Sequence, residues 1–94
     1  DDIWDFSEGL AAVKLNGKWG FIDKSGEFAK PEFDSVSNFS EGLAAVELNG
    51  KIGFIDKNGE FIAKPEFDSV STFSEGLARV ELNGKWGFID KSGC

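Results

Sequence analysis

Phe39 to Phe61 reads FSEGLAAVELNGKIGFIDKNGEF, and two other stretches of the chain repeat most of it. Phe6 to Lys24 reads FSEGLAAVKLNGKWGFIDK, and Phe73 to Lys91 reads FSEGLARVELNGKWGFIDK. Self-similarity at a fixed period is the sequence signature of a repeat architecture, so it is considered before any other pattern. The near identity of the three copies indicates either a recent duplication or a consensus array.

The chain has 94 residues, which predicts a single domain spanning residues 1–94. We divide it into repeat 1 (about 1–33), repeat 2 (about 34–67) and a partial repeat 3 (about 68–94). The interval is 33 residues from Phe6 to Phe39 and 34 residues from Phe39 to Phe73. Since a slip of one residue turns the following side chains of a strand to its other face, we expect an irregularity in the first connecting arm or a bulge in the second.

Each repeat has the signals of a three-stranded antiparallel meander. Asn-Gly between alternating apolar runs favours a two-residue hairpin turn, because both of its central residues need a positive φ. It occurs at 16–17, 49–50 and 83–84. In repeat 2 the predicted strands are 43–48, 51–57 and 60–64, and Pro65 closes the third strand or marks a sheet edge. Phe-Ser-Glu-Gly before each first strand predicts a tight turn.

The two-residue turns also predict the register and the two faces of each meander. Leu48 should lie opposite Lys51, and Ala45 opposite Phe54. Both faces are then mainly apolar; one carries Ala44, Val46, Leu48, Gly53, Ile55 and Ile62, and the other Leu43, Ala45, Ile52, Phe54, Phe61 and Ala63. Each meander should therefore be sandwiched between neighbours. The predicted fold class is all-β, with propeller-like or β-solenoid stacking of the meanders. We also expect bulky groups of neighbouring repeats to contact the backbone at Gly20, Gly53 and Gly87.

The motif F-S-E-G-L-A-x-V-x-L-N-G-K-W-G-F-I-D-K-x-G-E-F, followed by K-P-E-F-D, resembles the bacterial WG (KWG) repeat family over nearly the whole chain. Trp19-Gly20 and Trp86-Gly87 match the dipeptide that gives the family its name, whereas Ile52-Gly53 departs from it. The resemblance implies an all-β tandem-repeat protein and carries no catalytic assignment. A looser local likeness is to the choline-binding repeats of bacterial surface proteins, which bind ligands between aromatic hairpins.

Several classes of chemistry find no support in the residues. The chain has no histidine, which excludes Ser-His-Asp triads and His-ligated metal sites, and it has no phosphate-binding glycine motif. Carboxylates recur in every copy, as at Glu8, Glu41 and Glu75, so we interpret them as turn caps and solvated edges rather than as a catalytic pair. The cluster Asp1, Asp2 and Asp5 lacks the ligand spacing of a calcium loop. We therefore predict no enzyme activity, no cofactor and no metal.

The aromatic residues are the best candidates for contact with a partner. Trp19 and Trp86 occupy equivalent positions, Trp4 is unique to the first copy, and Arg79 replaces an alanine on the aromatic face of the last copy. One hypothesis assigns these four residues to a ligand or protein contact. The competing interpretation, which we favour for the tryptophans, is packing between repeats. Arg79 indicates that its face is less covered, as in a terminal repeat.

The net charge and the unpaired strand edges at the ends of the array limit the kinds of partner that the chain can bind. The net charge of −7 argues against nucleic acid as a partner, and no run of 18 apolar residues predicts a membrane span. Unpaired strand edges at the ends of an array favour pairing with another chain, head to tail or by closure of a ring. We predict a non-catalytic scaffold or protein-interaction module that associates with itself or with another protein. The alternative is a glycan-binding or small-ligand-binding module that uses aromatics between repeats.

Overall fold

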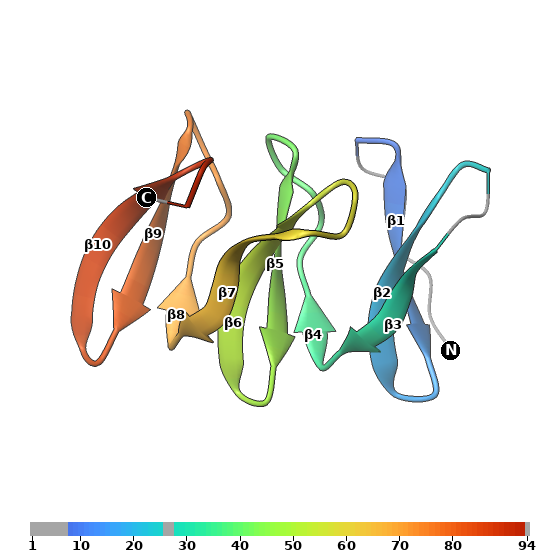
Figure 1. Cartoon of the computed structure of the whole chain (residues 1–94), viewed down its shortest axis with the longest axis horizontal. Helices are drawn as coiled ribbons and strands as arrows, with labels where there is room; N and C mark the ends of the chain where they lie inside the picture. Colours follow the sequence, from blue (N-terminus) through green and yellow to red (C-terminus); the bar gives the residue numbers. More distant parts are fainter. Residues whose placement is uncertain (1–7, 26–27, 94) are drawn as a thin grey trace.

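The computed structural model describes residues 8–25 and 28–93, and within these ranges all regular structure is β. Three antiparallel sheets follow one another along the longest dimension of the molecule, whose extents are 38 × 26 × 18 Å (Figure 1). The arrangement is an open row of sheets, and its stacking as a propeller or a solenoid stays a prediction. No helix among the described residues has the length and apolar character needed to cross a membrane.

The second sheet is the complete unit, and it has four strands in the order β4-β5-β6-β7. The first sheet has the order β1-β2-β3, and the third has the order β10-β9-β8. The strand bounds are β1 Leu10–Leu15, β2 Lys18–Asp23, β3 Phe28–Phe33, β4 Ser35–Val36, β5 Leu43–Leu48, β6 Lys51–Asp56, β7 Phe61–Phe67, β8 Ser69–Val70, β9 Leu77–Leu82 and β10 Lys85–Asp90.

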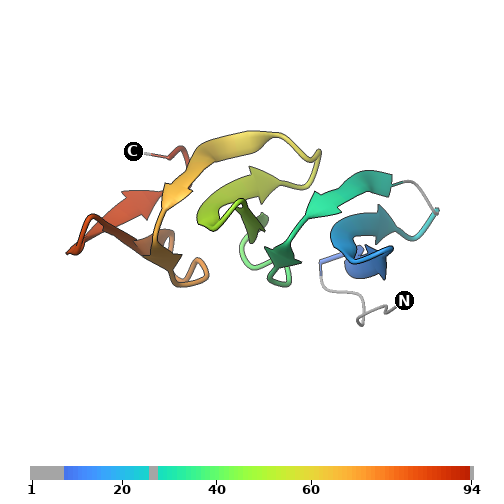
Figure 2. The ribbon, with the colours of Figure 1, turned by 90° about the horizontal axis from the view of Figure 1, so that it is seen from below.

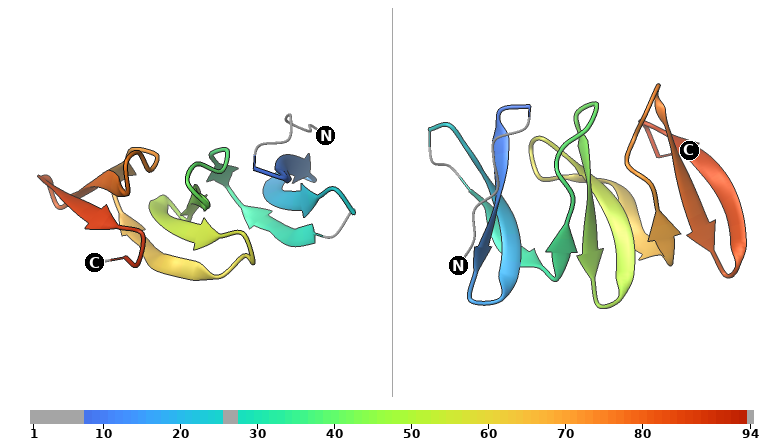
Figure 3. Two further views of the ribbon diagram at one scale, coloured as in Figure 1. Left: turned by 90° about the horizontal axis from the view of Figure 1, so that it is seen from above. Right: turned by 180° about the vertical axis from the view of Figure 1, so that it is seen from behind.

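The Asn-Gly hairpin of each sheet forms in the predicted register. Leu48 pairs with Lys51 and Ala45 with Phe54, and the same pattern holds in the other two hairpins. The turn residues Asn49 and Gly50 have φ values of 55° and 82°, which is the left-handed geometry that a two-residue turn requires. All three Asn-Gly turns lie along the same long edge of the row, one at each sheet (Figure 3).

A second two-residue turn precedes each hairpin. In repeat 2 the N–H of Ser40 donates to the carbonyl oxygen of Leu43 at 2.8 Å, and Glu41 and Gly42 form the turn with φ values of 54° and 83°. The predicted tight turn is therefore present. A positive φ is uncommon for glutamate, so this turn has a local conformational cost that contacts elsewhere must offset.

The short strands β4 and β8 were not predicted. Each follows a third strand directly along the chain but pairs with the first long strand of the next sheet, so that Val36 lies opposite Val46 and Val70 opposite Val80. The chain thus moves to the next sheet between Phe33 and Ser35, and again between Phe67 and Ser69. Seen from below, β3 and β7 run along the same side of the row before each crossing (Figure 2).

The extra residue of repeat 2 forms a bulge in β7. Phe54 pairs with Ala63 and Ile55 with Phe61, so Ile62 is the added residue; in repeat 1 the corresponding pairs run without a shift at this point. The alternative of a bulge in the second arm is confirmed. Pro65 lies within β7, which is an edge strand. The prediction that Pro65 marks a sheet edge is therefore confirmed, whereas the alternative that it closes the third strand is wrong.

The bulge corrects two side-chain predictions. The alternation placed Ile62 on the face of Ala44, but Ile62 packs against the cluster on the opposite face. Phe61 was assigned to the face of Phe54, but its ring meets the ring of Phe33 edge-on, on the other side of the sheet, with centroids 6.2 Å apart. Both assignments were wrong because one inserted residue reverses the alternation.

The core lies between the sheets, in two clusters that use opposite faces of sheet two. The first cluster joins repeat 1 to repeat 2 and contains Ala12, Phe21, Phe33, Val36, Phe39, Ala44, Val46 and Ile55. The second joins repeat 2 to repeat 3 and contains Leu43, Ala45, Phe54, Phe67, Phe73, Ala78, Val80 and Ile89. The prediction that both faces of a meander are covered is therefore confirmed for the middle repeat.

Candidate functional site

The clearest feature with a repeated geometry is the junction between consecutive repeats. At each junction an aromatic ring from the turn before one hairpin packs on the ring of the preceding hairpin. Phe39 meets Phe21 at a centroid distance of 4.8 Å and an interplanar angle of 71°, and Phe73 meets Phe54 at 4.9 Å and 76°. Edge-to-face pairs of this kind stabilise a protein by about 0.5–1.5 kcal/mol beyond the contribution of the apolar area that they bury.

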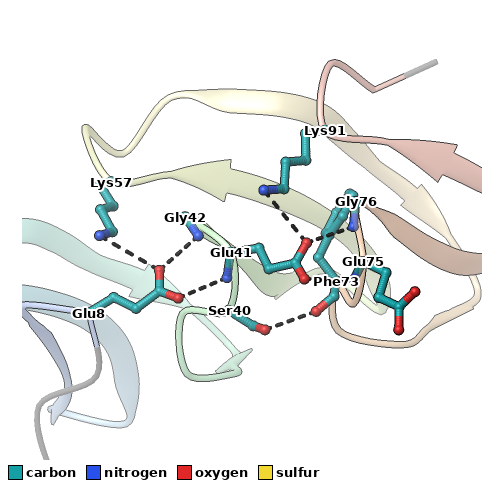
Figure 4. A network of polar contacts seen from close by, with 9 residues as sticks. All are labelled: Glu8, Ser40, Glu41, Gly42, Lys57, Phe73, Glu75, Gly76 and Lys91. Carbon is teal, nitrogen blue, oxygen red and sulfur yellow. Dashed lines mark hydrogen bonds and ion pairs between the residues drawn. The ribbon is translucent and has the colours of Figure 1, made fainter.

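A glutamate clamps each junction from the polar side (Figure 4). The carboxylate of Glu8 accepts hydrogen bonds from the backbone N–H groups of Glu41 and Gly42, at 2.8 and 2.7 Å. One repeat later, the carboxylate of Glu41 accepts from the N–H groups of Glu75 and Gly76, at 2.6 and 2.8 Å. These donors belong to the left-handed turns, so each carboxylate stabilises the strained turn of the following repeat.

The glutamate clamp has two further members at each junction. Lys57 lies 3.6 Å from Glu8, and Lys91 lies 3.6 Å from Glu41. At the second junction the hydroxyl of Ser40 also donates to the carbonyl oxygen of Phe73 at 2.9 Å. The N–H bonds do most to lower the pKa of both glutamates, foremost that of Gly42 on Glu8 and that of Gly76 on Glu41, and partial desolvation opposes them.

An aspartate at the start of each linking strand forms a second polar contact between repeats. Asp34 accepts from Lys18 and from the N–H of Asn49, and Asp68 accepts from Lys51 and from the N–H of Asn83. The lysine contact is the main reason that the pKa of each aspartate lies below its usual value. The lysines and aspartates are about one-third to one-half exposed, so the ion pairs themselves contribute little to stability.

Gly53 is one of the glycines predicted to contact a neighbouring repeat, but the backbone beside it belongs to its own sheet. A Cβ atom on Gly53 would lie 2.5 Å from the carbonyl oxygen of Ala63, so the backbone of β7, in the same sheet, occupies the space. The expectation of a bulky side chain from another repeat was therefore wrong there. Around Gly87 no heavy atom lies within 4 Å of such a Cβ, because the described part of sheet three has no strand beyond β10.

The predicted contact residues do not form one site. The ring of Trp19 is half-buried against the first cluster, with the Lys14 ammonium 6.0 Å from its centroid. Trp86 is 54% exposed on the outward face of sheet three, with the Arg79 guanidinium 5.3 Å from its ring centroid. Trp4 lies outside the described residues.

No metal site emerges from the part of the chain that the structure covers: no three His, Cys, Asp or Glu side chains there are grouped to hold an ion. The Asp1, Asp2 and Asp5 cluster and Cys94 lie outside that part. Sequence analysis did not identify the glutamate clamp as a contact between repeats. Its signal was present, because Ser-Glu-Gly recurs in every copy, but a turn cap within one repeat explained it equally well.

Comparison with known proteins agrees with this architecture. The family model for the WG containing repeat matches three times, at residues 1–19, 19–51 and 52–86. Searches among curated proteins and among solved structures found no match. The three matches together span residues 1–86, and each contains one Ser-Glu-Gly turn and the Asn-Gly turn of the hairpin after it, so the chain belongs to the WG-repeat family.

Proposed function

We propose that the chain is a non-catalytic interaction scaffold that associates with a second copy of itself through the outward face of sheet three. One observation carries this proposal. Leu77, Trp86 and Phe88 are 48%, 54% and 63% exposed, and they lie together on one face of the β9-β10 hairpin. Contiguous exposed apolar surface of this kind is typical of a protein contact site.

The middle repeat indicates what such a face binds. Its equivalents of Leu77 and Phe88 are Leu43 and Phe54, which are 6% and 0% exposed because repeat 3 covers them. The same backbone and nearly the same side chains are therefore suited to packing against another apolar β-face. A second copy of the chain supplies such a face at the same concentration as the first.

We propose a two-fold arrangement in place of the head-to-tail contact expected from the sequence, and the exposure of the two terminal sheets supports it. A head-to-tail contact needs the face of sheet one that carries Ala11 and Val13, and these residues are only 0% and 6% exposed. The outward face of sheet three is open by comparison, and it carries both signs of charge at Arg79 and Glu81. In a two-fold pair, such a face meets itself, and each cation can lie near the partner's carboxylate.

The experiment is a measurement of absolute mass by light scattering after gel filtration, over a concentration series and with reducing agent present. We expect a monomer–dimer equilibrium. Phe88→Ser should raise the dimer dissociation constant by at least about tenfold, since it removes an aromatic anchor from both sides. Leu82→Ser is the matched control, because Leu82 is 41% exposed on the opposite face of the same hairpin, and it should leave the equilibrium unchanged.

Two results would contradict the proposal. A monodisperse monomer at high micromolar concentration would show that the face does not associate. A ladder of trimers and larger species would show a head-to-tail contact instead of a two-fold one.

A second candidate function is binding of a glycan or small ligand by the aromatic residues, and the exposed stack of Arg79 on Trp86 favours it. An exposed indole is a stacking surface for a sugar ring as well as for a protein. The two functions differ in tryptophan fluorescence. Binding of an oligosaccharide should change the emission of the wild-type chain but not that of Trp86→Ile.

A further inference from the structure

A groove separates the second and third sheets on the side of β8. Its volume is about 210 Å³, and its lining includes Ser37, Glu47, Ile52, Val70, Ser71 and Thr72. The hydroxyls of Ser37 and Ser71 are held in place, since they accept hydrogen bonds from the N–H groups of Ala45 and Arg79 at 2.9 and 3.0 Å. The groove therefore has an apolar floor and rigid hydroxyl-bearing walls.

The groove coincides with the two positions that distinguish the first two hairpins. Between Phe6–Lys24 and Phe39–Lys57 the sequence changes only at Lys14/Glu47 and Trp19/Ile52. These positions are cross-strand partners in both hairpins, Lys14 opposite Trp19 and Glu47 opposite Ile52. Directly opposed residues project from the same face of a sheet, so both changes affect one place.

Burial shows what the loss of the indole does. In the first junction Trp19 packs on the cluster that contains Val36, and Val36 is only 8% exposed. In the second junction Ile52 holds the equivalent place, and the equivalent Val70 is half-buried. The smaller side chain leaves part of this junction uncovered, at the edge where the groove lies.

The charge of the pair is reversed as well. In hairpin one the Lys14 ammonium lies 6.0 Å from the centroid of the Trp19 ring, a cation–π arrangement. In hairpin two a half-buried carboxylate, Glu47, replaces the ammonium beside the space that the ring would fill. Relative to its neighbour, this junction lacks an aromatic ring and a positive charge.

We propose that the groove binds a small planar aromatic amine, which supplies the ring and the charge together. The ring lies against Ile52 and Val70, and the ammonium group lies at the carboxylate of Glu47. This inference goes beyond the proposed self-association, because it uses the junction between sheets two and three and not the outward face of sheet three.

The test uses tryptamine as the probe, with indole and indole-3-acetate as comparisons that lack the charge or reverse it. Binding is followed by the methyl chemical shifts of Ile52 and Val70 during titration of the 94-residue chain. A ligand of this size in an open groove should bind with a dissociation constant of about 1 mM. Tryptamine should bind most tightly and indole-3-acetate least. Absence of saturation at about 10 mM tryptamine overturns the proposal.

Two substitutions locate the site. Glu47→Gln should weaken tryptamine binding by up to about fivefold and leave indole binding unchanged, as expected for a partly exposed ion pair. Glu81→Gln is the matched control, because Glu81 is the equivalent carboxylate of hairpin three and does not line the groove. An equal effect of both substitutions on tryptamine binding overturns the assignment to Glu47.

Ile52→Trp restores the residue found in the other two hairpins and should fill the groove, so that tryptamine no longer shifts the Val70 methyls. Tryptamine binding that survives in a folded Ile52→Trp variant overturns the proposal, because the ligand then lies elsewhere. If this variant does not fold, the Glu47→Gln and Glu81→Gln comparison decides the question alone.

Discussion

The second and third hairpins have nearly the same sequence and the same pairing, yet their outward faces differ in burial. Phe54 is 0% exposed and Phe88 is 63% exposed, although each follows a glycine in the second strand of its hairpin and lies opposite the equivalent position of the first strand. The hairpin is therefore a local property of the repeat, whereas its core is supplied by the next repeat. Stability in such an array resides largely in the junctions.

The largest expected difference between the two hairpins comes from their phenylalanines. Phe54→Ala should lower the free energy of unfolding by about 3–5 kcal/mol, because it leaves a cavity under Phe73. Phe88→Ala should change it by no more than about 0.5 kcal/mol, as for other exposed positions. Urea denaturation at low protein concentration measures both. Equal effects would mean that the outward face of sheet three is covered in the monomer.

The equivalent glycines of the two hairpins, Gly53 and Gly87, should differ less in their effect on stability. Gly53→Ala should cost about 1–3 kcal/mol, since its Cβ would overlap the β7 backbone at Ala63 and the edge strand must move. Gly87→Ala should be neutral or slightly stabilising, because space is open there and alanine loses less entropy in a strand. Thermal unfolding of the two variants is the measurement. A neutral Gly53→Ala would show that β7 shifts without loss of pairing.

The smallest expected difference concerns the contribution of the glutamate clamp to stability and the dependence of that contribution on pH. The pKa values of Glu8 and Glu41 lie below their usual 4.5 in the folded chain, since the ionised carboxylates accept backbone N–H bonds. A lowered folded-state pKa contributes stability above the unfolded pKa, and this contribution is lost as the pH falls through the folded pKa. Stability should therefore decrease below about pH 5.

The matched variants separate the clamp from general acid effects. Glu41→Gln should flatten the pH dependence of unfolding, because the amide does not titrate and offers one acceptor oxygen where the carboxylate offers two to the N–H groups of Glu75 and Gly76. Glu75→Gln should change it less, since Glu75 lies in the turn before the third hairpin and no further described repeat follows it. Fluorescence-detected unfolding between pH 7 and pH 3 tests this. If both variants have the same slope, the clamp does not contribute to acid stability.

Much of the fold could be predicted because the hairpins depend on local signals. The Asn-Gly turns set the register of β5 and β6, and the register in turn sets which residues share a face. The count of 34 rather than 33 residues indicated an irregularity in the first arm or a bulge in the second, and the structure places the bulge at Ile62. The all-β class and the sandwiching of the middle repeat followed from these patterns.

The missed features depend on contacts between segments that are separated along the chain. The strand Ser35–Val36 has only two residues, and it exists because Val46 of the next hairpin lies beside it. Glu41 could cap its own turn or the following one, and only the geometry of the junction decides between them. The groove at Ile52 likewise depends on how the third sheet lies against the second, which no single repeat encodes.

The glutamate clamp gives the row of sheets a direction. Each carboxylate acts on the turn of the repeat that follows it along the chain, from Glu8 to Gly42 and from Glu41 to Gly76. Ribosomes release a chain from its N-terminus, so an earlier repeat already offers its carboxylate when the next strained turn emerges. Synthesis and folding can then proceed in the same order, one junction at a time, with each finished repeat serving as the template for the next.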